Sequence, residues 1–130
     1  MTKMQSPAAV VTGFPNLVLR AEGAMLLAAA ALGYAQTGTG WGLFAVLFLV
    51  PDVFMLGYLR GPRMGAAIYN VGHSTILPFL VIGLGLMLPV TAMLAVGLIW
   101  MAHVGFDRAV GYGLKYGAGF KQTHLSAPAV

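Results

Sequence analysis

Two histidines and two aspartates interrupt stretches of the chain that are otherwise apolar: Asp52, His73, His103 and Asp107. Imidazole nitrogens and carboxylate oxygens are ligands that zinc, iron and manganese accept. His103 and Asp107 are four residues apart, so in a helix they share one face. The four residues therefore predict a site for a divalent metal, which could assist the hydrolysis of an amphiphilic substrate.

The same four side chains admit two other interpretations. Polar groups inside a membrane protein also form hydrogen-bonded cores that only fix how the helices pack. Carboxylates and imidazoles also form proton or ion pathways. The corresponding functions are a structural or accessory membrane protein and a small proton-coupled carrier. The residue types leave these alternatives open, and with them whether the protein is an enzyme and what its substrate is.

Other polar residues fall in the same part of the predicted structure. Those expected to support the site are Glu22, Tyr58, Asn70 and Ser74. Those expected to meet an anionic headgroup are Arg63, Arg108 and Lys115. His124 lies in the tail and is expected to be solvated unless the tail folds back under the helices.

Long apolar stretches must position these groups. Of the 130 residues, 59% are hydrophobic and 8% are charged, whereas a soluble domain carries about 25% charged residues. Each stretch has about 19 residues or more, enough to cross a hydrocarbon core of about 30 Å. The predicted fold is all-α, a four-helix transmembrane bundle. Its segments are a tail at 1–15, a membrane domain at 16–112 with spans at about 17–35, 41–59, 65–88 and 90–110, and an interfacial loop and tail at 113–130.

Basic residues orient the predicted bundle. All seven lysines and arginines flank the ends of the spans that share one side. Such residues collect on the cytoplasmic side, so both termini are predicted to be cytoplasmic in a multi-pass membrane protein. The ionisable and amide groups of all four spans then lie within roughly 12 Å of the cytoplasmic boundary.

Prolines and glycines predict irregular helices and close helix contacts. Pro51 and Pro78 lie inside spans and are expected to kink them or to free a carbonyl, which for Pro51 is that of Leu47. Asn16 is expected to cap the first helix. The glycines expected to admit close helix approach are Gly83, Gly85 and Gly97.

Composition narrows the function classes further. The chain has no cysteine, which excludes disulfides, thiolate metal sites and cysteine nucleophiles. The net charge is +4, but the basic residues lie beside apolar segments, so no nucleic-acid binding is predicted. The expected partner is the lipid bilayer, and a bundle with so few helices to enclose a polar cavity is expected to form a homo-oligomer.

Four motif-bearing segments carry a family resemblance: 51–58, 65–73, 102–116 and 120–125. In these segments the chain is similar to domain-of-unknown-function family 4260, a family of small, uncharacterised bacterial membrane proteins. The resemblance extends from about Leu19 to Leu125. It implies the four-span fold and a bacterial inner membrane, and it implies no reaction.

A second likeness is to membrane-bound metal-dependent hydrolases of the inner-membrane type. These carry a Pro-Asp element, a Thr-His-Ser-like element and a His-xxx-Asp pair. The elements occur here in that order as Pro51-Asp52, His73-Ser74 and His103 with Asp107. Two positions depart from the pattern, since Phe54 replaces a second aspartate and Gly72 replaces the threonine. The likeness implies metal-assisted hydrolysis with one carboxylate fewer, so a second metal ion is not implied.

Overall fold

A computed structural model of the chain describes residues 10–114 and Leu125. Over these residues the backbone is helical, with short turns between the helices and no strand. The helices are α1 (Gly13–Thr37), α2 (Trp41–Leu47), the 3-10 helix η1 (Val50–Arg60), α3 (Pro62–His73), α4 (Ile76–Met87) and α5 (Thr91–Ala109). The predicted all-α class is confirmed.

The first helix begins earlier than its apolar pattern indicates. Thr12 occupies the N-cap position of α1, so the prediction that Asn16 caps this helix is wrong. Asn16 lies within the first turn, and its amide donates to the carbonyls of Val11, at 2.9 Å, and Leu125, at 3.0 Å. Asparagine is a common N-cap residue, but here its side chain links the start of the described chain to Leu125 near the other end.

Each central apolar stretch is broken near its proline, as predicted. In the second stretch α2 ends at Leu47 and η1 begins at Val50, with Pro51 in the first turn of the 3-10 helix. In the third stretch Ser74 is extended, at φ −78° and ψ 161°, and separates α3 from α4. Pro78 lies in the first turn of α4, where its missing N–H is tolerated. Two predicted crossings are therefore each built from two helices.

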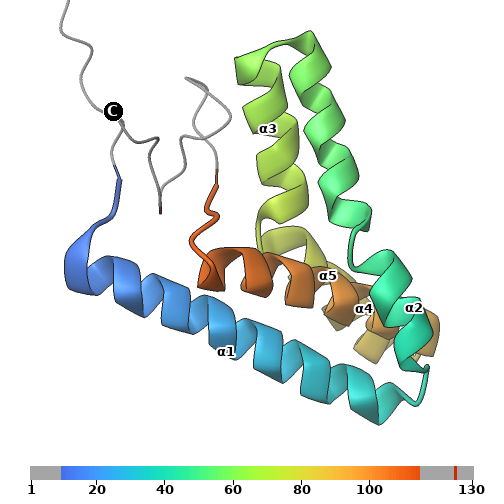
Figure 1. The fold of residues 1–130 in the computed structure, drawn as a ribbon. Helices are drawn as coiled ribbons and strands as arrows, with labels where there is room; N and C mark the ends of the chain where they lie inside the picture. The colour runs from blue at the N-terminus through green and yellow to red at the C-terminus, as the bar shows by residue number, and fades with distance from the viewer. Residues whose placement is uncertain (1–9, 115–124, 126–130) are drawn as a thin grey trace, which may run out of the picture.

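Helix α5 packs against both α1 and α4. Figure 1 shows α5 running beside α1, with α4 behind it, while η1 and α3 stand side by side at a steep angle to this layer. The breaks in the second and third stretches make this change of direction possible. As a result, the start of η1 and the end of α3 both come close to the C-terminal half of α5.

Glycines set the closest contacts between helices. A Cβ atom on Gly105 of α5 would lie 2.7 Å from the Gly23 carbonyl of α1. A Cβ atom on Gly85 would lie 2.6 Å from the Leu94 nitrogen, and one on Gly97 would lie 2.9 Å from the Ile82 nitrogen. The close approach predicted at Gly85 and Gly97 is thus present. The prediction for Gly83 is wrong, because no atom of the described chain lies within 4 Å of a Cβ there.

The described surface matches a lipid environment. Three helical stretches are long and apolar enough to cross a membrane: Gly13–Thr37, Trp41–Arg60 and Pro62–Met87. Large apolar side chains lie on the outside, for example Leu59 at 86% exposure and Met87 at 79%. The fourth predicted crossing corresponds to α5, whose C-terminal half carries His103, Asp107 and Arg108. Sequence and surface together indicate a membrane protein; the side of each terminus stays a prediction.

Candidate metal centre

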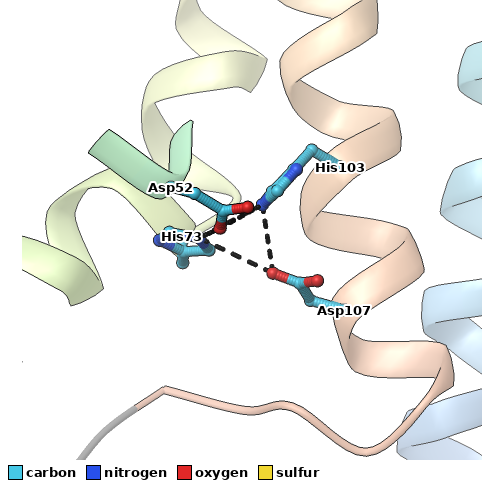
Figure 2. A group of neighbouring side chains, drawn as sticks. All are labelled: Asp52, His73, His103 and Asp107. Atoms are coloured by element: carbon cyan, nitrogen blue, oxygen red, sulfur yellow. Dashed lines mark hydrogen bonds and ion pairs between the residues drawn. The ribbon is translucent and has the colours of Figure 1, made fainter. Parts of the chain in front are cut away.

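The four residues singled out by their chemistry meet at one point. Asp52 comes from the first turn of η1, His73 is the last residue of α3, and His103 and Asp107 lie one turn apart on α5. Each offers one ligand atom, and these atoms all lie within 4.8 Å of one another. Figure 2 shows the four side chains converging from the three elements. Residues separated by up to 55 positions in the sequence thus share one site.

The distances between the facing atoms are short and similar. Nε2 of His103 lies 3.1 Å from Asp107 Oδ2, 3.2 Å from Asp52 Oδ1 and 3.2 Å from Nε2 of His73. Nε2 of His73 lies 3.4 Å from Asp52 Oδ1 and 3.6 Å from Asp107 Oδ2. The two imidazoles therefore share the same pair of carboxylates.

Backbone carbonyls fix which nitrogen of each ring faces the site. His73 Nδ1 lies 2.9 Å from the Tyr69 carbonyl, and His103 Nδ1 lies 2.5 Å from the Phe48 carbonyl. A carbonyl only accepts, so each Nδ1 carries a proton and donates it. In a neutral ring the other nitrogen, Nε2, then presents a lone pair. Both lone pairs point into the site.

The break after α2 explains why the Phe48 carbonyl can accept from His103. In a continuous α-helix this carbonyl would accept from the N–H of Asp52, but that N–H donates to Leu49 instead, at 3.1 Å. The sequence predicted a freed carbonyl near Pro51 and assigned it to Leu47. The carbonyl bonded to the site is one residue further on, because the chain continues as a 3-10 helix with bonds three residues apart.

Burial differs sharply among the four side chains. Both histidine side chains are 3% exposed and Asp107 is 14% exposed, whereas Asp52 is 39% exposed. The Tyr69 ring stacks on His73 with the centroids 3.8 Å apart and the planes at 8°. The site is closed behind the imidazoles and open on the side of Asp52.

The geometry and the donor set fit one divalent metal ion. Ligand atoms about 2.0–2.2 Å from a zinc ion, at the corners of a tetrahedron, lie about 3.3–3.6 Å from one another. Five of the six distances between the facing atoms run from 3.1 to 3.6 Å, and the distance between the two carboxylates is within 4.8 Å. Two neutral imidazoles and two carboxylates are also a donor set that iron and manganese accept. Asp52, His73, His103 and Asp107 are the residues that could hold the ion.

The remaining predicted site residues lie outside this group. Glu22 is exposed on α1, and among the described residues it forms no ion pair. The half-buried ones are Tyr58, Asn70, Ser74 and Arg108, and Arg63 is exposed at the start of α3. Lys115 and His124 lie outside the described residues.

Sequence reasoning missed three residues that orient the histidines. Phe48 and Tyr69 supply the two carbonyls, and the Trp100 indole donates to the Gly72 carbonyl at 2.6 Å, one residue before His73. A signal exists for Tyr69, which precedes His73 by four residues and so lies on the same helix face. No comparable signal identifies Phe48, because its role depends on where the helix breaks.

Comparison with known protein families shows to which family the chain belongs. The model of the family described as Domain of unknown function (DUF4260) matches residues 16–127. The chain belongs to the DUF4260 family. All four residues of the cluster lie within the part that matches the DUF4260 model. Neither a curated protein nor a solved structure matches the chain.

Proposed function

We propose that this DUF4260 protein is a metal-dependent membrane hydrolase whose ion is held by Asp52, His73, His103 and Asp107. The proposed substrate is an amphiphilic ester or phosphoester drawn from the bilayer. The observation that carries the proposal is the convergence of four hydrogen-bond acceptors on one point. The resemblance of the Pro-Asp, His-Ser and His-xxx-Asp elements to membrane-bound metal-dependent hydrolases supports the reaction class.

Four converging acceptors require a positive charge between them. The Nε2 atoms of His73 and His103 lie 3.2 Å apart, and both face carboxylate oxygens. Without a cation these atoms repel one another in a site where water screens little. A divalent ion removes the repulsion at all four atoms, whereas a proton on one imidazole removes only part of it. The neighbouring carbonyls suit a metal further, because they turn Nε2 of each ring toward the site and select the neutral tautomer whose Nε2 can bind an ion.

Each ligand has a distinct role in the proposed reaction. A bound divalent ion supplies Lewis acidity, which polarises the substrate oxygen and acidifies a water molecule. His73 and His103 are buried, Asp107 is half-buried, and these three hold the site in place. Asp52 is the exposed carboxylate, and its second oxygen, Oδ2, accepts the proton of the attacking water. The water oxygen bonds to the ester carbon or phosphorus, the bond to the alcohol oxygen breaks, and that oxygen takes the proton from Asp52.

The cluster also favours a second candidate, a proton-coupled carrier. Two imidazole nitrogens 3.2 Å apart can share one proton, and the carboxylates on either side can accept it. This arrangement would need no metal. Metal analysis separates the two functions, because a carrier keeps its pathway in metal-free protein.

Metal content is the first test. Protein purified in detergent should hold about one equivalent of a transition metal per chain, directly or after reconstitution with zinc, iron or manganese. Asp107→Asn should lower this content at least about tenfold, because it removes a half-buried charged ligand. Glu22→Gln is the matched control: it also neutralises a carboxylate within a helix, and that carboxylate lies outside the cluster. It should leave the metal content unchanged.

Two outcomes would contradict the proposal at different levels. Less than about a tenth of an equivalent of any transition metal after reconstitution would refute the metal site. If the protein binds a metal but hydrolyses no ester or phosphoester amphiphile with zinc, iron or manganese, the proposed reaction is refuted. The proposed metal site would then still stand. Size-exclusion profiles identical to wild type show that Asp107→Asn is folded.

A further inference from the structure

An apolar groove begins beside the candidate metal centre and runs along α5. Its walls come from the joint between α2 and η1 and from the middle of α5, and its volume is about 280 Å³. The lining residues are Leu47, Val50, Pro51, Val96, Ile99 and Trp100. None of these side chains is charged, and the only polar group among them is the indole N–H of Trp100, which donates to Gly72.

The groove and the metal ligands share their supporting residues. Pro51 lines the groove and directly precedes Asp52. Trp100 lines the groove one turn before His103, and its indole bonds to the residue before His73. From Val96 to His103 the helix rises by about 10 Å. The groove therefore leads away from the cluster along α5 toward the middle of the predicted span.

The groove is open at its rim and closed at its floor. Val50 is 48% exposed and Val96 is 43% exposed, whereas Ile99 is 1% exposed. Val50 lies within the Trp41–Arg60 stretch, which is long and apolar enough to cross a membrane. An occupant can therefore enter sideways from the bilayer without crossing water.

We propose that this groove binds one acyl chain of an amphiphile and brings its headgroup to the exposed side of the cluster, beside Asp52. An extended peptide segment does not suit the groove, because its backbone N–H and C=O groups would find no partners on apolar walls. A hydrocarbon chain needs none. That the bound amphiphile is the substrate rests on the proposed function; that the groove binds an acyl chain does not.

Tryptophan fluorescence gives a direct test. The chain has two tryptophans, so the full-length Trp41→Phe variant reports from Trp100 alone. The probe is a single-chain phosphocholine amphiphile with bromine on its acyl chain, titrated into protein in excess unbrominated detergent. Quenching of Trp100 should saturate, and bromine near the headgroup should quench more than bromine near the chain end, because Trp100 lies close to the cluster. The Trp100→Phe variant reports from Trp41. Its quenching should not saturate, because it comes only from the probe mixing into the detergent micelle.

Groove-filling variants supply the control. In the Trp41→Phe background, Val96→Phe should lower the affinity for the amphiphile. The expected loss is at least about fourfold for each methylene group of the acyl chain that the new phenyl ring displaces. Val50→Phe narrows the groove from the opposite wall and should have the same effect. Leu84→Phe should change nothing, because Leu84 is similarly exposed, at 47%, but lies on α4 outside the groove.

The groove proposal can be refuted independently of the metal site. Unsaturable quenching of Trp100, or equal affinities in Val96→Phe, Val50→Phe and Leu84→Phe, would overturn the groove proposal even if the metal is present. Saturable quenching in a protein that binds no metal would keep the acyl groove and refute the hydrolase.

Discussion

Each histidine of the cluster has one neighbouring residue that contacts it twice, through a backbone carbonyl and through an aromatic ring. Tyr69 gives its carbonyl to His73 Nδ1 and stacks its ring on the imidazole. Phe48 gives its carbonyl to His103 Nδ1, and its ring lies 5.1 Å from the imidazole at 60°. In each case the backbone carbonyl sets the tautomer of the imidazole, and the aromatic ring sets the plane in which the imidazole lies. The carbonyl is retained in any substitution of these residues, so only the ring contribution can be removed by mutation.

The first residue-scale prediction concerns pH. Metal binding requires both imidazoles to be neutral, and imidazole ordinarily has a pKa of about 6.5. Well below that pH, two protons must leave for each ion bound. The apparent metal affinity should therefore fall by up to about two decades per pH unit as the pH is lowered further. Chelator competition across pH 5–8 measures this slope.

A matched variant checks the cause of that slope. Asp107→Asn retains both imidazoles, so it should bind metal more weakly at every pH and keep the same steepness. A pH-independent affinity in the wild type would show that the histidines are not ligands.

At the scale of elements, broken helices bring the site together. A straight second span would leave the Phe48 carbonyl bonded within its own helix, and a straight third span would carry α3 along the direction of α4. The joint at Phe48–Leu49 and the extended Ser74 redirect the chain, so that η1 and α3 meet α5 at the cluster. The prolines predicted these breaks from sequence. The direction of each bend could not be predicted, because it depends on packing between helices.

The close crossing of α1 and α5 yields an element-scale prediction. Gly105→Ala should lower the free energy of unfolding by about 1–3 kcal/mol, since its Cβ would meet the Gly23 carbonyl and the Leu27 nitrogen, each at 2.7 Å. Gly105 lies between His103 and Asp107, so metal affinity should fall as well. Unfolding in a denaturing detergent measures the stability.

Gly83→Ala is the control for this substitution. The same methyl group is added within a helix, but at a position without a neighbour within 4 Å in the described chain. Alanine favours a helix over glycine, so stability should be unchanged or rise by up to about 1 kcal/mol. Equal losses in both variants would show that the crossing does not limit stability.

The sequence could predict that four polar side chains share one depth in the membrane, because depth follows from position along each span. It could also predict that His103 and Asp107 share a face. It could not predict that Asp52 and His73 turn toward them, because rotation about a helix axis leaves depth unchanged. Glu22 illustrates the difference: it was expected in the same layer, yet it is exposed on α1 and outside the cluster.

At the scale of the whole molecule, the predicted orientation in the membrane can be tested by labelling. The chain has no cysteine, so single cysteines can be introduced at the exposed Thr12 and Thr39, one at each end of α1. The 25 residues of α1 extend about 37 Å, more than the hydrocarbon core. On intact cells a membrane-impermeant maleimide should label Thr39→Cys and spare Thr12→Cys.

Permeabilised cells provide the comparison for this experiment. There both cysteines should react, which shows that Thr12→Cys is accessible to the reagent. The reverse pattern on intact cells would invert the predicted orientation, and labelling of both would contradict a crossing by α1.

The pairing of α1 with α5 has a consequence for how the protein is made. Arg20 donates to the Ala109 carbonyl at 3.0 Å, and Gly23 receives the close approach of Gly105. Helix α1 thus leaves the ribosome about 70 residues before its partner α5. At ribosomal rates of about 5–20 residues per second, it waits roughly 4–14 s for that partner. Nascent chains halted before α5 would retain an unpaired α1, a natural target for quality-control proteases of the membrane.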